Sequence, residues 1–224
     1  MSERSMIGAT MATACLLAGL ATQARSRLPS DARLPTHWNA AGEADGFAAA
    51  ATALLLPIGL ALGLAVLFVV IARLDPLQQR MARSRALLDT AWAALLGLTA
   101  VIEVVIAAPA FGWHLPAALP LVAVGVLLVV IGNALPKSRP GFFVGIRTPW
   151  SVVDADNWVA THRLGAWTFI GGGLLIVAAA LLPVAAAVRE AAVLGAVALA
   201  VVPPVIRSWW LWHARAAASD RSEV

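Results

Sequence analysis

Four side chains that can bind ligands or exchange protons lie close together in the segment LPTHWNAAGEADGF, residues 34–47. They are His37, Trp38, Asn39 and Asp45. The Pro, Asn and Gly residues around them favour turns. One hypothesis is that the four side chains contact a peptide or other ligand. The alternative is a compact turn in which Trp38 packs on neighbouring helices and His37 bonds to the backbone.

A second, longer polar segment is GNALPKSRPGFFVGIRTPWSVVDADNWVATHRLG, residues 132–165. Its four aromatic side chains would be unfavourable in a flexible loop, and its Pro and Gly residues fix turns, so we predict an ordered structure. Asp154 is a good N-cap for a short helix from Ala155 towards Arg163. Four residues would share one face of that helix, and we expect this face to lean on the bilayer or on the aromatic rings of the loop: Trp158, Thr161, His162 and Gly165.

The same segment is basic, and an arginine makes forked contacts to carboxylate or phosphate groups. For Arg147 and Arg163 two interpretations stay open. They form ion pairs with Asp154 or Asp156 or contact lipid headgroups, or they form a docking site for a cytoplasmic partner or a small anion. The amide of Asn133 can cap free carbonyls or bond across helices. The candidate contact residues of this segment are Asn133, Lys137, Arg139, Arg147, Trp150, Trp158, His162 and Arg163.

Glu103 is the one acid placed well inside a long apolar run. A carboxyl group in such a place is costly to bury and is a candidate functional group. A local structural role, with His114 or a base of a neighbouring loop as partner, and a ligand or proton role are both open.

Metal and cofactor chemistry has little support. The four His residues and the single Cys15 lack any metal-ligand spacing, so we expect no metal and no other cofactor. A membrane-embedded enzyme would use His37 with Asp45, or His162 with Asp154, as general acid and base. Because no nucleophile motif or phosphate-binding loop accompanies them, we predict that the protein is not an enzyme.

The elements that position these residues follow from the composition. Of the 224 residues, 61 % are hydrophobic and only 12 % are charged, against roughly 25 % charged in soluble domains. That excludes a soluble enzyme, a nucleic-acid-binding module and a disordered regulator. Six runs are long enough to cross a membrane as helices. We therefore predict an all-α polytopic membrane protein with spans at residues 6–24, 47–72, 86–108, 115–135, 164–188 and 191–212.

The distribution of basic residues predicts the orientation. With the N-terminus and the C-terminus both inside, twelve of the sixteen Lys and Arg residues lie on the cytoplasmic side. Segment 34–47 is then outside, and segment 132–165 is inside. The net charge of +4 suits an anionic inner leaflet rather than direct binding of nucleic acid. We interpret the first run as a retained helix and not as a cleaved signal peptide.

The two polar segments together resemble the SdpI family of bacterial immunity proteins. Segment 34–47 is similar to the LPxHWxxxGxxDG signature of a small domain of unknown function that often precedes the SdpI region. Segment 132–165 resembles the pattern GNxLPKxRPNxFxGIRTPWTLxxxxxWxxTHRxxG, with Gly141 and Ser151 in place of the usual Asn and Thr. The resemblance divides the chain into an N-terminal part at 1–72, an SdpI-like four-helix part at 73–213 and a cytoplasmic tail at 214–224.

The resemblance also implies a function. In the best-known system of the family, a multispanning protein of the bacterial inner membrane protects its producer from a secreted peptide toxin. It also holds a small DNA-binding repressor at the membrane. If this system is carried over to the present chain, the toxin would contact four residues of segment 34–47: His37, Trp38, Asn39 and Asp45. The inner segment, or the basic residues Arg73–Arg85, would meet the repressor. The alternative is a small membrane transporter or exporter, and self-association into a homo-oligomer stays open.

Overall fold

The computed structural model describes residues 3–74, 78–141 and 144–222, with the side chains of 74–83 and 216–222 left undescribed. Six of its helices are long and apolar enough to cross a membrane, which confirms the all-α polytopic prediction. They are α1 (Glu3–Arg27), α2 (Ala50–Leu74), α3 (Gln78–Ala107), α4 (Leu119–Ala134), α6 (Ala155–Leu181) and α7 (Ala186–Ser222).

Shorter elements connect these helices. Two strands, β1 (Arg33–Trp38) and β2 (Ala44–Ala49), form a hairpin between α1 and α2. The turns of 3₁₀-helix are η1 (Ala108–Phe111) and η2 (Leu135–Lys137), and α5 (Pro149–Val153) precedes α6. The hairpin corrects one detail of the prediction. Phe47 to Ala49, expected at the start of the second span, belong to β2, because they pair with β1 before the helix begins at Ala50.

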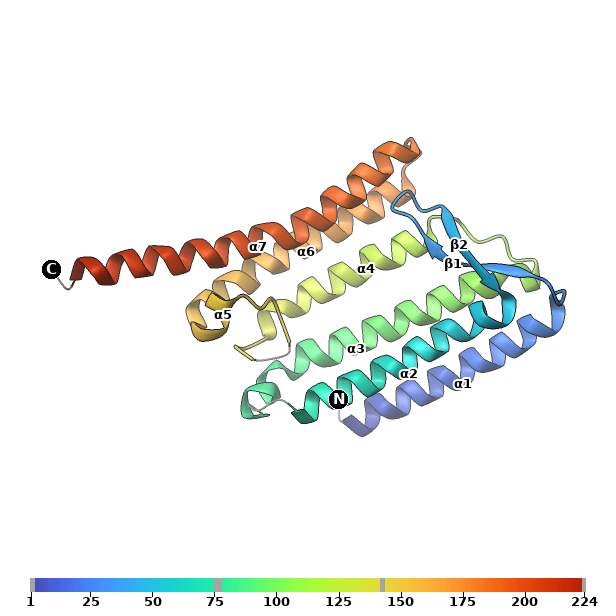
Figure 1. Ribbon diagram of the computed structural model, residues 1–224, viewed down its shortest axis with the longest axis horizontal. Coiled ribbons are helices and arrows are strands. Elements are labelled where there is room, and N and C mark those ends of the chain that lie inside the picture. Colours follow the sequence, from blue (N-terminus) through green and yellow to red (C-terminus); the bar gives the residue numbers. More distant parts are fainter. Residues whose placement is uncertain (1–2, 75–77, 142–143, 223–224) are drawn as a thin grey trace.

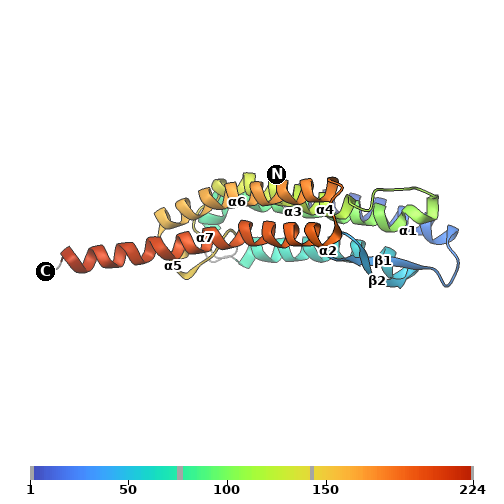
Figure 2. The same ribbon diagram turned by 90° about the horizontal axis from the view of Figure 1, so that it is seen from above.

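The spanning helices form a flattened bundle, and Figure 2 shows that α7 and α2 lie in one layer and α6, α4 and α3 in the other. In Figure 1 the order of the helices runs from α7 through α6, α4 and α3 to α2 and α1. The N-terminus, the C-terminus and α5 lie at one end of the bundle, and the hairpin lies at the other. The two polar segments of the sequence are therefore at opposite ends of the helices.

Small residues allow the helices of the C-terminal half to approach closely. A Cβ atom added to Gly125 of α4 would lie 2.7 Å from the Gly173 carbonyl oxygen of α6. A Cβ atom on Gly172 would lie 2.7 Å from the Ala196 carbonyl oxygen of α7. Backbone approach of this kind is how helices associate in lipid, where the hydrophobic effect between them is absent.

A proline inside α7 is matched by a side chain of α6. Pro204 has no N–H group, so it leaves the carbonyl of Ala200, four residues earlier, without its helical donor. The hydroxyl of Thr168 donates to this carbonyl over 3.0 Å. The contact satisfies a buried acceptor and fixes the position of α7 along α6.

In the N-terminal half, α1, α2 and α3 enclose their own core. The Trp92 ring of α3 is buried and stacks on Phe68 of α2 at 5.4 Å between centroids. Its indole Nε1–H donates to the Thr10 hydroxyl of α1 over 3.0 Å. One buried aromatic side chain thus joins three helices.

Candidate functional site: two polar surfaces at opposite ends of the bundle

The segment before α6 is anchored first by Ser138 and Ser84. The Trp158 indole Nε1–H donates to the Ser138 hydroxyl over 3.2 Å, and that hydroxyl donates to the Leu135 carbonyl. Ser84 of α3 accepts from the Arg139 backbone N–H (2.9 Å) and donates to the Arg139 carbonyl (3.1 Å). The start of the segment is therefore fastened to α6 and α3 by buried hydrogen bonds.

His162 holds the next turn of the segment. Its Nε2 atom accepts from the Ile146 backbone N–H over 2.9 Å, and its Nδ1 atom lies 2.8 Å from the Trp158 carbonyl. An acceptor at Nε2 and a donor at Nδ1 are the two roles of a neutral imidazole. Gly145, with φ +114°, lies against the stacked His162 and Trp158 rings, where a Cβ atom would be 2.5 Å from Nε2.

Helix α5 begins at a reciprocal cap. The Thr148 hydroxyl accepts from the Ser151 N–H, and the Ser151 hydroxyl accepts from the Thr148 N–H, each over 3.0 Å. Pro149 occupies the first helical position, where its missing N–H costs nothing. Thr148 also lies 2.6 Å from the hydroxyl of Ser208 on α7. The cap thus ties α5 to the last helix.

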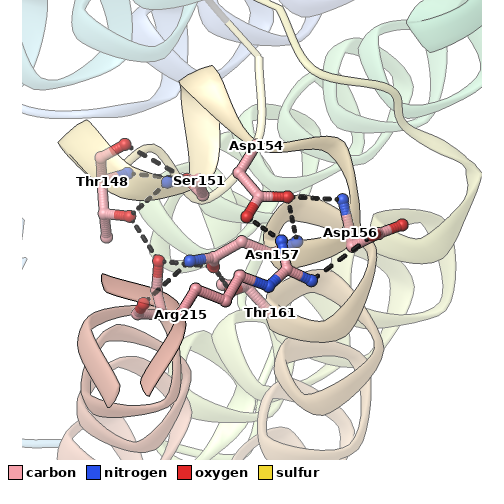
Figure 3. Close-up of polar contacts among 8 residues, drawn as sticks. Thr148, Ser151, Asp154, Asp156, Asn157, Thr161 and Arg215 are labelled. Atoms are coloured by element: carbon pink, nitrogen blue, oxygen red, sulfur yellow. Dashed lines mark hydrogen bonds and ion pairs between the residues drawn. The ribbon is translucent and has the colours of Figure 1, made fainter. Parts of the chain in front are cut away.

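Asn157 extends this contact into a buried network between α5, α6 and α7, drawn in Figure 3. Its Oδ1 atom accepts from Ser208 (2.8 Å) and Thr161 (3.0 Å), and its Nδ2 group donates to the Ser208 carbonyl (2.9 Å). Since Ser208 donates its single proton to Asn157, Thr148 is the donor in the Thr148–Ser208 pair. Every polar atom of Asn157 that the network uses is fully buried.

Asp154 caps α6, as the sequence predicted. Its carboxylate accepts from the Asp156 N–H (2.9 Å) and the Asn157 N–H (3.1 Å) and pairs with Arg215 of α7 (Figure 3). Partial burial by itself raises the pKa of Asp154. Three groups that stabilise the charged carboxylate have a larger effect and hold the pKa below the ordinary value: the Asn157 N–H, the Arg215 guanidinium and the Asp156 N–H. The cation beside Asp154 is therefore Arg215, where the sequence suggested Arg147 or Arg163.

The predicted residues of this segment separate into two groups. Trp158 and His162 are buried, so they fix the shape of the segment from inside. The Trp150 ring lies 6.0 Å from Trp212 of α7. The others are exposed, at the end of the bundle opposite the hairpin: Asn133, Lys137, Arg139, Arg147 and Arg163.

An open depression of about 400 Å³ marks this exposed surface. Its lining consists of Arg147, Thr148, Pro149, Val152 and Val153. Val153, the last residue of α5, is 80 % exposed. The surface combines a guanidinium with apolar side chains. Phe142 and Phe143, expected to contribute aromatic packing, lie outside the described residues.

At the opposite end, the hairpin holds the other predicted residues. His37 Nδ1 lies 2.5 Å from Asp45 Oδ1 across the two strands, and both side chains are exposed. The Asn39 side chain accepts from the Glu43 N–H over 2.9 Å and closes the turn. Trp38 packs against the core formed by α1, α2 and α3. Segment 34–47 therefore forms the compact turn of one interpretation and also exposes the polar side chains of the other.

The tip of the hairpin rests on the C-terminal half of the chain. Arg189, in the first turn of α7, donates to the Ala41 carbonyl (3.3 Å), the Ala179 carbonyl (3.0 Å) and the Val184 carbonyl (3.4 Å). Gly42, with φ +81°, packs on Leu121 of α4. The hairpin thus bridges the two halves at its own end of the bundle.

Glu103 is fully buried in α3, and neither carboxylate oxygen has a hydrogen-bond partner within the described part of the chain. His114, the suggested partner, is exposed. Among the residues that the structure describes, no three His, Cys, Asp or Glu side chains gather where they could hold a metal ion.

Sequence reasoning missed Ser84, Ser208, Arg189 and Arg215. Ser208 had a usable signal, because a lone hydroxyl inside an apolar run invites a search for its partner. The count of basic residues includes Arg189 and Arg215 but predicts no partner for either. Arg189 contacts Ala41, which is more than a hundred positions away, and Arg215 contacts Asp154, which is about sixty positions away. A local sequence pattern cannot predict pairs so far apart.

Comparison with known families adds two matches. Residues 137–208 match the SdpI/YfhL protein family, and residues 11–62 match a domain of unknown function, DUF1648. The first match covers the inner segment from Lys137 onward, α5, α6 and α7 as far as Ser208. The second covers the hairpin and parts of its flanking helices α1 and α2. No match to a curated protein or to a solved structure was found.

Proposed function

We propose that this chain, whose residues 137–208 match the SdpI/YfhL protein family, is an immunity and signal-transducing protein of the bacterial inner membrane. In this proposal the hairpin surface around His37, Trp38, Asn39 and Asp45 receives a secreted peptide toxin. The exposed surface of the inner segment, with Arg147 and Arg163, then holds a cytoplasmic DNA-binding repressor.

The observation that carries the proposal is the placement of two ordered polar surfaces at opposite ends of the same helices. α6 and α7 contribute to both. At the hairpin end, Arg189 of α7 contacts Ala41. At the other end, Ser208 of α7 and Asn157 of α6 hold the inner segment. A receptor that reports an outside ligand to an inside partner needs such a connection.

Protection of sensitive cells tests the immunity part. Bacteria expressing the chain should survive a related peptide toxin that kills the empty-vector strain. Asp45→Asn, which removes the carboxylate partner of His37, should reduce survival without reducing the amount of protein in the membrane. Glu190→Gln, which neutralises an acid at the same end of the bundle outside the hairpin, is the matched control. Survival equal to that of the empty vector with every related toxin would contradict immunity.

A pull-down from membranes tests the signalling part. The chain should retain a cytoplasmic DNA-binding protein only when the peptide is present. Arg147→Glu should abolish this retention and leave survival unchanged, because the residue lies on the surface opposite the hairpin. Retention that does not depend on the peptide would contradict peptide-controlled sequestration.

Transport is the second candidate, and Glu103 is the observation that favours it. A buried carboxyl group without a partner in a spanning helix is typical of proton or substrate pathways. A transporter would lower the amount of labelled peptide inside energised cells, and Glu103→Gln would abolish that effect. Full activity in Glu103→Gln would exclude a functional role for this carboxyl group.

A further inference from the structure

The hairpin has one strand edge with unpaired hydrogen-bond donors. The Ala50 N–H donates to the Ala32 carbonyl over 2.9 Å, and the register pairs Leu34 with Ala48. In an antiparallel ladder, hydrogen-bonded pairs alternate with pairs whose backbone groups point outward. The residues between the bonded pairs, Phe47 and Ala49 on β2, therefore direct their N–H groups away from β1.

The two edges of the hairpin differ. On β1, Pro35 has no N–H, so this edge lacks a donor for a further strand. Natural sheets use proline at edges in this way to prevent unwanted strand pairing. On β2 no proline intervenes, and in the described part of the chain neither Phe47 N–H nor Ala49 N–H has an acceptor. The carbonyl of Phe47 is covered by Arg33, whose Nη2 group donates to it over 2.8 Å.

The spacing of the free donors selects the ligand. Residues two apart in a strand lie about 7 Å apart, and an extended peptide presents its carbonyls at this same repeat. An added strand of this kind is a known mode of peptide recognition. The side chains on the same face of the hairpin give the edge a central aromatic ring, Phe47, which is 51 % exposed.

Charge along the edge adds a second requirement. Glu43 and Asp45 are exposed at the turn, and the Arg33 guanidinium lies at the Phe47 carbonyl, further from the turn. A peptide with a basic residue near the turn and an apolar residue over Phe47 complements this pattern. A segment with acidic residues near the turn would be repelled.

We propose that the outer edge of β2, at Phe47 and Ala49, binds an extended peptide segment with a basic residue at one end as a third strand of the hairpin. This inference rests on the proposed function, because it specifies how a secreted peptide is recognised at the outer surface. It assigns the recognition to backbone donors, which tolerate variation in the peptide sequence.

Amide hydrogen exchange of the full chain in lipid nanodiscs tests the edge directly. The probe is a synthetic peptide of alternating Thr and Val with two Lys residues at one end. A peptide with Pro at alternate positions is the control probe. With the first peptide, exchange at Phe47 and Ala49 should slow at least tenfold, while Ala48, already paired with Leu34, should change little. With the control peptide, neither amide should slow.

Two variants separate the backbone donor from the side chain. Ala49→Pro removes one outward N–H and should weaken binding of the probe at least tenfold. Ala49→Val keeps the N–H and should bind like the wild type. Slow exchange at Ala48 in both variants shows that the hairpin is intact.

Three results would overturn the proposal. One is unchanged exchange at Phe47 and Ala49 at saturating probe. Another is equal binding by Ala49→Pro and Ala49→Val. The third is slow exchange at both amides without any peptide, increasing with protein density, which would mean that β2 pairs with a second copy of the chain. Cell survival is measured separately. Edge pairing without survival would refute immunity alone, and survival without edge pairing would refute this inference alone.

Discussion

Gly145 is a position where the side chain of any other residue would collide. Its φ of +114° is rare for residues with a Cβ atom, and the added atom would also meet His162 and Trp158. We expect Gly145→Ala to lower the free energy of unfolding by more than about 2 kcal/mol. The inner segment would be displaced first, because His162 holds the Ile146 N–H.

Thermal unfolding in detergent micelles measures the effect of this substitution. Gly171→Ala is the matched control, since a Cβ atom there meets nothing within 4 Å and alanine is the better helix former. A melting temperature that falls equally in the two variants would contradict the assigned role of Gly145.

Asp154 gives a pH dependence to the end of the bundle opposite the hairpin. Its folded pKa lies below its ordinary value, which is about 3.9. The stabilising contribution is therefore complete above the ordinary pKa and is lost as the pH falls through the lower, folded pKa. Because Arg215 is exposed and its ion pair is screened by solvent, we expect this loss to be small.

Two substitutions at Asp154 separate the charge from the cap. Asp154→Asn keeps a capping side chain and should remove the acid-dependent loss of stability. Asp154→Ala should also lose the cap, at a further cost of about 1 kcal/mol. Melting temperatures between pH 3 and pH 7 measure both effects. An unchanged pH profile in Asp154→Asn would refute the electrostatic part.

At the scale of elements, α5, α6 and α7 are held together by polar groups inside an apolar protein. Removing Asn157 would leave the Ser208 carbonyl and the hydroxyls of Ser208 and Thr161 short of partners. We expect Asn157→Ala to cost about 2–4 kcal/mol. Thr161→Val, which removes a single hydrogen bond, should cost about 1 kcal/mol. Chemical denaturation in micelles compares the two, and equal costs would mean that the network does not act as a unit.

The prediction of elements succeeded where local patterns decide them. The Asp154 cap is confirmed, and the four residues predicted to share a face of the following helix are all buried. That helix is longer than expected, because it continues through the fifth span to Leu181. Its polar face is covered by the inner segment and α7, not by the bilayer.

The hairpin was not predicted, since its strands are six residues each and contain Pro35 and Gly46. These residues weaken the strand signal. Pairing is decided by the register between β1 and β2 and by the helices beneath them. Segment 34–47 alone indicates a turn, which Asn39 and Gly42 do form.

At the scale of the whole molecule, the orientation in the membrane follows from the basic residues and stays a prediction. The single cysteine makes it easy to test, because Cys15→Ser leaves a chain without any thiol. In that background, Glu43→Cys should react with an impermeant maleimide added to intact cells. Val153→Cys should react only after permeabilisation. The opposite pattern would place both termini outside.

The division of the chain at residues 72 and 73 also stays a prediction, but the contacts between the two parts qualify it. Arg189 and Leu121 meet the hairpin tip, and Trp92 of α3 stacks on Phe68 and donates to Thr10. The two parts are therefore in contact both at the hairpin and along α3. α7 continues as a helix through Ser222, so the predicted tail begins within a regular element.

The sequence by itself determined the class of molecule. Long apolar runs have one stable solution in lipid, a helix that satisfies its own backbone, so the six spans follow from composition and from the length of the apolar runs. Their boundaries do not, because the fifth predicted span ends at residue 188 whereas α6 ends at Leu181. Only the tertiary structure decided which polar groups meet. Asn157 with Ser208, Asp154 with Arg215, and Arg189 with the hairpin are contacts between distant segments. They depend on how the helices align, and helix alignment is fixed by packing of the whole bundle.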